Sequence, residues 1–293
     1  MKKIIVPTDF SKESANATAY AMRLAESLQM HVELVHLLNA NTYVSYVRAY
    51  VPVYTPEMEY PRVQEDIHIA ESRMNQFITS INESTPSHHA VDDYTIEYGF
   101  VNDFLKNRSH NQDVAYIVMG QRQNKDWLEK LFSSSHDTLW EEVEVPIWVI
   151  PDSAHYSPIK NTLYLTDYED QDFEVLSKLV RLVAPFQSQI QVLHVSESSD
   201  DEALEQRKQF THGLMERPDL KPIVEDLHVI VSEHVAQSVT DYVRIHNADL
   251  VVCYKTSKNL LQRFLDKFVY EDVIDDVSNK VAVPILIFNQ KSS

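Results

Sequence analysis

The stretch IIVPTDFS, residues 4–11, decides the fold because a similar stretch recurs half a chain later. An apolar run ends there in a short polar turn. TLYLTDYE, which begins at Thr162, repeats both parts and places Asp167 opposite Asp9. Internal repetition of this kind predicts two copies of one structural unit.

The next apolar run keeps the same register. HVELVHLL, from His31, is repeated by QIQVLHVS, from Gln189, so that His36 corresponds to His194. Both pairs lie 158 positions apart (167 − 9 and 194 − 36). The two halves therefore match without a gap across strand, helix and strand.

Two later runs repeat at shorter offsets. DVAYIVMG, which ends at Gly120, corresponds to ADLVVCY, which ends at Tyr254. VPIWVIP around Pro146 corresponds to VPILIFN around Pro284. The offsets are 134 (254 − 120) and 138 (284 − 146), so the first half holds 24 residues more in its middle (158 − 134).

The apolar runs and the segments between them indicate an α/β fold. The runs are rich in Val, Ile and Leu with little alternation, which is typical of strands in a parallel sheet covered by helices on both faces. Ser11 is a candidate cap for a helix through Leu28. A second helix is predicted by an apolar stripe of Val63, Ile67, Ala70, Met74, Phe77, Ile78 and Ile81.

Two doubly wound α/β domains follow from this alternation, each with a five-stranded parallel sheet and right-handed crossovers. The length of 293 residues agrees, because single domains usually have about 100 to 200 residues. We expect the domains at residues 1–151 and 161–293. Residues 152–160, in a proline-containing stretch without helical or strand periodicity, form the expected linker.

Composition excludes several classes of function. The formal net charge of −18 repels polyanions, so nucleic-acid binding is not expected. No apolar run approaches the ~20 residues of a membrane-spanning helix, so membrane insertion is not expected either. The apolar run after the first lysines is too short for a signal peptide, and the single cysteine, Cys253, cannot form an intramolecular disulfide. A cytoplasmic location is therefore predicted.

Ligands of open parallel sheets bind beyond the carboxyl ends of the strands, where the strand order reverses. In the first half this crevice collects residues that end three strands: Pro7, Thr8, Asp9, Leu37, Met119 and Gly120. Asp9 has two interpretations. Its carboxylate suits a ribose hydroxyl or a nucleobase amine, and it equally suits the start of the following helix.

At these residues the chain resembles the universal stress protein family in its tandem, two-domain form. The resemblance rests on IIVPTDFSKES, on LVH at the end of the second strand, on VMG at the end of the fourth, and on VPIWVI. It implies a flavodoxin-like fold and dimerisation through the last strand. We therefore expect the halves to pack as a pseudo-dimer through residues 146–150 and 284–288, with a homodimer as a further possibility.

In one branch of the family, the resemblance also implies ATP held by a G-x2-G-x9-G-[ST] loop. Here Gly120 supplies the first glycine, Gln123 and Ser133 replace the other two, and Ser134 is the hydroxyl residue. Glycine lets backbone N–H groups approach phosphate closely, and each charge-assisted hydrogen bond lost costs about 1.5 to 3 kcal/mol. ATP or AMP binding is therefore disfavoured.

The second half departs further from that loop. Tyr254 replaces the first glycine, and no glycine follows it. The remaining crevice residues in this half are Thr166, Asp167 and Val195. We expect this crevice to be the more degenerate of the two.

Three other features of the sequence have both a functional and a structural interpretation. Tyr46, Tyr50 and Tyr54 lie in a long insert, residues 41–62, which is either a lid over the crevice, a partner surface, or a flap packed on the neighbouring domain. His36 and His194 are expected to be core histidines. His88 and His89 adjoin in a polar loop, which disfavours a shared metal, and no catalytic sequence motif occurs.

The leading functional prediction is a non-catalytic stress-response or signalling module that acts by binding a protein or a small ligand. One alternative is a residual nucleotide binder in which Asp9, Gly120 and Ser134 hold ATP or AMP. Another is a carrier of small molecules or lipids with the tyrosine-rich insert as its lid. No metal is expected, and the only cofactors considered, ATP and AMP, are disfavoured.

Overall fold

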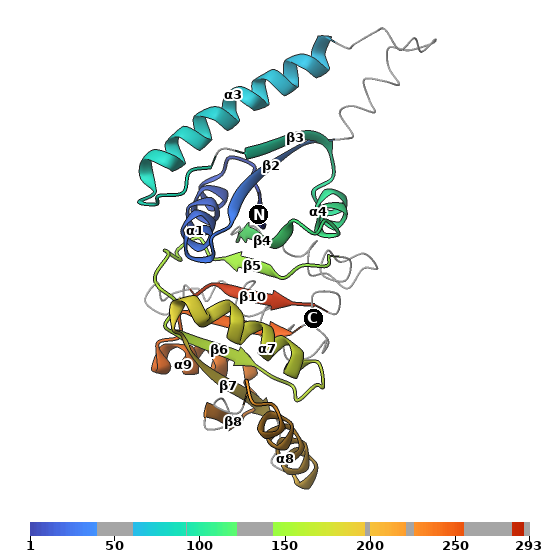
Figure 1. The fold of residues 1–293 in the computed structure, drawn as a ribbon, viewed down its shortest axis with the longest axis vertical. Coiled ribbons are helices and arrows are strands. Elements are labelled where there is room, and N and C mark those ends of the chain that lie inside the picture. The colour runs from blue at the N-terminus through green and yellow to red at the C-terminus, as the bar shows by residue number, and fades with distance from the viewer. Residues whose placement is uncertain are drawn as a thin grey trace, which may run out of the picture. The chain divides into compact units, whose positions relative to one another are not determined.

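The computed structural model describes residues 1–39, 61–91, 93–121, 143–196, 200–220, 226–254 and 283–289. The chain divides into two compact units, Met1–Gly120 and Gln121–Ser293. Strands and helices alternate along both units, as Figure 1 shows. The predicted α/β class is therefore confirmed.

The first unit is built on a parallel sheet with the strand order β3-β2-β1-β4. Its elements are β1 (Lys3–Pro7), α1 (Lys12–Leu28), β2 (His31–Asn39), α3 (Pro61–Ser84), β3 (Asp93–Gly99), α4 (Val101–Ser109) and β4 (Val114–Gly120). Helix α1 packs against β1, β2 and β4. The strand order reverses between β1 and β4, which is the switch point where crevices form.

The second unit holds the parallel order β8-β7-β6-β9-β10, with β5 added antiparallel beside β10. Its elements are β5 (Ile147–Ile150), β6 (Asn161–Leu165), α7 (Asp172–Val183), η1 (Ala184–Phe186), β7 (Gln189–Ser196), α8 (Asp201–Glu216), β8 (Leu227–Val231), α9 (Val235–His246), β9 (Leu250–Tyr254) and β10 (Ile285–Phe288). Strands β5 and β10 are the two segments that the sequence predicts to meet.

Strand register confirms the two main repeat offsets. Lys3 lies opposite His31 in the first unit, and Asn161 lies opposite Gln189 in the second. Each residue of the second pair therefore follows its counterpart in the first pair by 158 positions (161 − 3 and 189 − 31). Ile5 lies opposite Ile117 in the first unit, and its counterpart Leu163 lies opposite Val251 in the second. Ile117 and Val251 are therefore equivalent, with the predicted offset of 134 (251 − 117). Equivalent positions can therefore be compared residue by residue.

The first two helices form where the sequence predicts them. Ser11 caps α1, because its side chain accepts a hydrogen bond from the backbone N–H of Ser14. Helix α3 begins at Pro61, two residues inside the insert expected to be loop, since proline suits the first position of a helix. The rest of the insert lies outside the described residues. No helix in the described part of the chain is long and apolar enough to cross a membrane.

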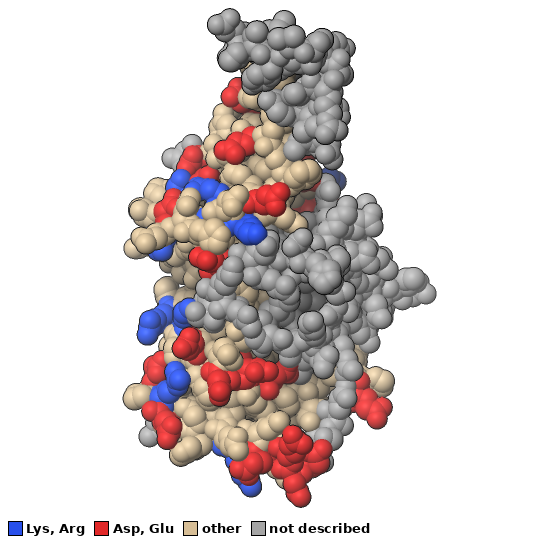
Figure 2. Space-filling view, turned by 90° about the vertical axis from the view of Figure 1, so that its right-hand side faces the viewer, with Lys and Arg blue, Asp and Glu red and all other residues tan. Residues whose placement is uncertain are grey.

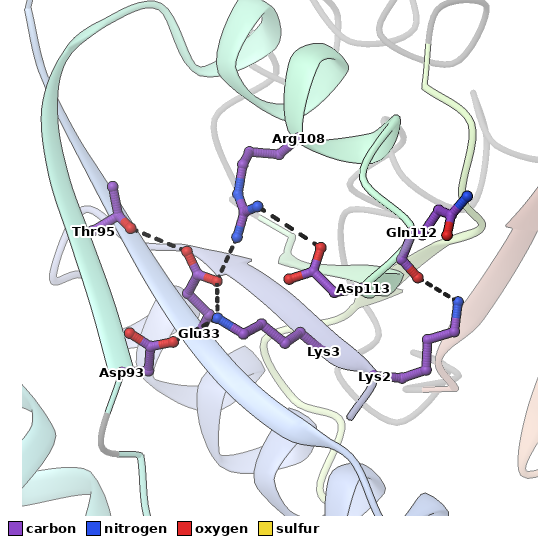
Figure 3. Close-up of polar contacts among 8 residues, drawn as sticks. All are labelled: Lys2, Lys3, Glu33, Asp93, Thr95, Arg108, Gln112 and Asp113. Atoms are coloured by element: carbon purple, nitrogen blue, oxygen red, sulfur yellow. Dashed lines mark hydrogen bonds and ion pairs between the residues drawn. The ribbon is translucent and has the colours of Figure 1, made fainter.

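A buried carboxylate, Glu33, ties together the elements at the amino end of the first sheet (Figure 3). Lys3 Nζ lies 3.0 Å and an Arg108 guanidinium nitrogen 2.6 Å from Glu33 Oε2, and Thr95 donates its hydroxyl to Oε1 at 3.0 Å. Hydrogen bonds to Asp93 and then to Glu33 raise the pKa of Lys3. The charge of Glu33 is thereby compensated where water is excluded.

In the second unit, uncharged side chains occupy the positions equivalent to Glu33 and Arg108. Gln191 corresponds to Glu33 (33 + 158), and Tyr242 corresponds to Arg108 (108 + 134). The Tyr242 hydroxyl donates to Gln191 Oε1 at 3.4 Å, and burial raises the pKa of Tyr242 to about 12. One unit thus uses an ion pair and the other a neutral hydrogen bond between the same strand and helix positions.

This equivalence predicts the outcome of exchanging the pair. Glu33→Gln should destabilise the fold by about 3 kcal/mol, the lower end of the cost of breaking a buried ion pair, because Lys3 and Arg108 still reach water. Adding Arg108→Tyr, which reproduces the pair of the second unit, should recover part of that loss. Denaturant unfolding measures both changes.

The matched control is Glu97→Gln, which removes an exposed carboxylate from β3 and should stay within about 0.5 kcal/mol of wild type. A Glu33→Gln variant as stable as this control would contradict the role assigned to the network.

Candidate functional site

The candidate site of the first unit lies at the carboxyl ends of β1, β2 and β4. Pro7 ends β1 and Gly120 ends β4, while the backbone N–H of Thr8 donates to the carbonyl of Val35 on β2 at 2.8 Å. Leu37 and Met119 belong to the last residues of β2 and β4. The fold therefore brings the described crevice residues of this half to one edge of the sheet.

The turn after β1 is organised by its own side chains. Buried Thr8 accepts a hydrogen bond from the backbone N–H of Phe10 at 3.1 Å and donates its hydroxyl to Ser14 Oγ at 3.0 Å. Exposed Asp9 accepts from the backbone N–H of Ser11 at 3.1 Å. Asp9 thus takes part in shaping the start of α1, as the capping interpretation requires.

His36 clamps this turn to β2. Its Nδ1 lies 2.8 Å from the carbonyl oxygen of Thr8, and because a carbonyl only accepts, Nδ1 carries the proton. Burial lowers the pKa of His36, the hydrogen bond to Thr8 raises it, and the charge of Arg73 lowers it further; the net shift is downward. The ring is therefore neutral at pH 7 and acts as a structural donor.

An aromatic side chain covers each clamping histidine. Phe10, whose φ of 64° lies in the left-handed region, packs on His36 with ring centroids 4.3 Å apart. In the second unit Tyr168 has φ 63° and stacks on His194 at 4.1 Å, and His194 Nδ1 lies 2.8 Å from the carbonyl of Thr166. Left-handed φ is uncommon for such bulky residues, so both turns are held by their surroundings.

Gly120 has a packing role that the sequence does not reveal. A Cβ added at this position would lie 2.4 Å from the carbonyl oxygen of Glu13, in the first turn of α1. The absence of a side chain lets the helix start approach the end of β4. This glycine is thus required by the fold whether or not a phosphate binds there.

The second unit keeps the turn but changes the residues around it. Thr166 and Asp167 follow β6, Val195 lies near the end of β7, and Tyr254, 7% exposed, stands where the first unit has Gly120. Asp172 replaces Ser14 (14 + 158) and is 2% exposed. A tyrosine and a carboxylate therefore stand at the positions that hold a glycine and a serine in the first unit.

Asp172 is the residue that sequence reasoning missed. Its carboxylate accepts hydrogen bonds from the Tyr164 hydroxyl at 2.6 Å, the Thr166 hydroxyl at 2.5 Å and the backbone N–H of Glu169 at 3.2 Å. Burial raises its pKa to about 6, and the hydrogen bonds oppose that shift. The available signal was the repeat itself, in which position 14 pairs a serine with an acid.

Several predicted residues lie outside the part of the chain that the structure describes. They are Gln123, Ser133 and Ser134 of the loop after β4, and Tyr46, Tyr50 and Tyr54 of the insert. Their roles stay predictions. Within the described ranges, no group of three or more His, Cys, Asp or Glu side chains is arranged to hold a metal ion.

The second unit has an acidic surface and a buried, protonated cysteine. Figure 2 shows groups of Asp and Glu side chains on its surface, and helix α8 exposes Asp201, Glu202 and Glu205. Burial, Asp167 and Asp172 all raise the pKa of the buried Cys253 thiol. The surface field disfavours polyanions, and the thiol stays protonated and unreactive.

A comparison with family models and a comparison with solved structures agree with each other. The model of the "Universal stress protein family" matches residues 1–151 and 158–289. A universal stress protein from Archaeoglobus fulgidus DSM 4304 is similar in structure, with a TM-score of 0.62, 15% sequence identity and coverage of 98% of this chain and 96% of that one. No match was found among curated proteins.

A second solved structure supports the same fold. It is a putative universal stress protein from Pseudomonas aeruginosa UCBPP-PA14, with a TM-score of 0.52, 11% identity, and coverage of 99% of this chain and 94% of that one. Both matches cover at least 98% of this chain, so the likeness extends over both repeats.

The packing role of Gly120 predicts a stability defect without any ligand. Gly120→Ala should lower the free energy of unfolding by about 1 to 3 kcal/mol, because a Cβ meets backbone there. Thermal or denaturant unfolding of the ligand-free protein is the measurement.

Gly99→Ala provides the matched control, since its Cβ would meet only the flexible Leu37 side chain, at 3.2 Å. If both variants were equally stable, Gly120 would have no special packing role.

Proposed function

The chain belongs to the universal stress protein family, and we propose that it acts as a non-catalytic stress-response or signalling module whose crevices no longer hold ATP. One observation carries this proposal: Gly120, the single glycine that survives from the phosphate loop, is needed by the packing of α1 on β4. Its presence therefore gives no evidence of a retained phosphate site.

Loss of the other glycines supports the same view. Gln123 and Ser133 stand at positions where the loop needs close backbone approach to phosphate. Two missing charge-assisted hydrogen bonds at about 1.5 to 3 kcal/mol each would remove about 3 to 6 kcal/mol of the ~8 kcal/mol of a micromolar site.

The second crevice supports the proposal through charge. Asp172 and Asp167 bring carboxylates to the turn after β6, and Tyr254 replaces the glycine at the end of β9. A triphosphate would meet negative charge and a bulky ring in place of donors. We infer that this crevice is closed to nucleotides.

The two histidines of the crevices have a structural role, and no catalytic sequence motif accompanies them. His36 and His194 each use Nδ1 to hold the adjacent turn, and His36 is kept neutral mainly by burial. We therefore propose that the module acts by binding a small ligand or a protein partner in the cytoplasm.

A thermal-shift series tests the nucleotide prediction. Millimolar ATP with magnesium should leave the melting temperature within about 1 °C of the ligand-free value, whereas a site with a Kd one-hundredth of the ligand concentration would add about 2.7 kcal/mol of stability. Hydrolysis of ATP should stay at background.

Loop restoration gives the complementary test. Gln123→Gly with Ser133→Gly should confer an ATP-dependent shift, because the crevice is retained, and the control pair Gln123→Ala with Ser133→Ala should not. A shift in the wild-type protein that Asp9→Ala abolishes would instead establish the residual nucleotide binder. A shift with fatty acid alone, abolished by Tyr46→Ser and Tyr50→Ser, would establish the carrier.

A further inference from the structure

Asp172 occupies a position in the second unit that calls for an explanation beyond ligand exclusion. It lies in the first turn of α7, is almost fully buried, and accepts hydrogen bonds from Tyr164, Thr166 and Glu169. No Lys or Arg side chain in the described ranges pairs with it. A buried carboxylate without a cation is costly to ionise.

The position equivalent to Asp172 in the first unit carries an uncharged side chain, Ser14. Ser14 Oγ accepts from the Thr8 hydroxyl at 3.0 Å and donates to the carbonyl of Ser11 at 3.0 Å. In both units the threonine hydroxyl also accepts the N–H of the aromatic residue that has positive φ, Phe10 or Tyr168. The same hydrogen-bonded turn therefore ends on a hydroxyl in one unit and on an ionisable group in the other.

The described groups around Asp172 come from three elements. Tyr164 lies on β6, Asp167 and Glu169 lie in the turn, and Cys253 and Tyr254 lie on β9. Asp167 is the nearby charge that disfavours ionisation, and the three donors favour it. These opposing effects place the pKa of Asp172 at about 6, within the range of intracellular and mildly acidic environments.

We propose that Asp172 makes the turn of residues 166–172 proton-responsive: its ionised carboxylate holds the turn, and protonation loosens it. This role of Asp172 goes beyond the function of a non-catalytic binding module. It concerns the second unit, and it stands whether or not the first crevice binds a nucleotide.

The hydrogen-bond donors around Asp172 determine which of its oxygens takes the proton. Oδ2 accepts from both Thr166 and Glu169, and the N–H of Glu169 cannot reverse its role, so the added proton belongs on Oδ1. The Tyr164 hydroxyl then has to turn and accept, because Oδ1 has become the donor. The bonds to Thr166 and Glu169 lose their charge assistance and about half their strength.

Loosening spreads from Thr166 to Tyr168. The Thr166 hydroxyl accepts the N–H of Tyr168 at 2.9 Å, and this contact helps to hold the φ of 63° and the stacking on His194. A weaker anchor at Asp172 therefore frees the aromatic residue that covers the second crevice.

The global effect of protonation has the opposite sign. The folded pKa of Asp172 lies above its usual value of 3.8, so the folded state binds the proton more readily than the unfolded state. Its contribution to stability is greatest below the unfolded value and declines as pH rises through about 6. Acidification thus strengthens the fold while it loosens the turn, a combination that a purely structural carboxylate would not give.

An NMR titration of the full-length protein between pH 4 and pH 8 tests the proposal. The side-chain carboxyl carbon of Asp172 and the backbone amides of Tyr168 and Glu169 should share one inflection near pH 6. Protection of those amides from exchange, corrected for the intrinsic rate, should fall several-fold between pH 7 and pH 5.

Three variants extend the test, and two of them exchange the residues at equivalent positions of the two units. Asp172→Ser copies the turn of the first unit and should abolish the inflection at the two amides, whereas Glu174→Gln, which removes an exposed acid from the same helical turn, should retain it. Ser14→Asp should create a second inflection in the first unit.

Titration of Asp172 below pH 4.5, or amides of Tyr168 and Glu169 that do not respond with it, would overturn the proposal. An inflection that persists in Asp172→Ser would do the same. If that variant does not fold, the wild-type titration still decides, because the carboxyl carbon reports on Asp172 directly.

Discussion

The hydrogen bond between a histidine ring and the carbonyl of a turn threonine is the contact on which both crevices depend. It measures 2.8 Å in each unit, from His36 to Thr8 and from His194 to Thr166. Because the carbonyl accepts, it fixes the tautomer of the ring and joins the second strand of each repeat to the end of the first. The histidine held by this bond also packs against the aromatic residue at positive φ, Phe10 or Tyr168.

Around that constant contact the two units differ mainly in charge. At the carboxyl end, Ser14 and Gly120 of the first unit give way to Asp172 and Tyr254. At the amino end, the ion pair of Glu33 gives way to the neutral pair of Gln191 and Tyr242. The buried carboxylate therefore lies at the amino end of the sheet in the first unit and at the carboxyl end in the second, where we propose that it responds to protons.

Sequence patterns predicted the features that depend on local order and repetition. The offsets of 158 and 134 reappear in the strand register, and Ser11 caps α1 as expected, because capping and register follow from nearby residues. The role of Gly120 was not predictable, because it depends on how closely α1 approaches the end of a strand from another part of the chain. The role of Asp172 depends on how the strand and turn just before it fold around a buried carboxylate, and its one signal was the serine-to-acid exchange in the repeat. A glycine in a phosphate-like loop and an acid in an acidic run look ordinary in sequence.

We propose that the fold still shapes a crevice but no longer retains a nucleotide in it. Native mass spectrometry of protein purified without added nucleotide tests this claim most directly. The account predicts a mass equal to that of the polypeptide, without an adenine nucleotide. A retained ATP or AMP that disappears in Asp9→Ala would contradict it.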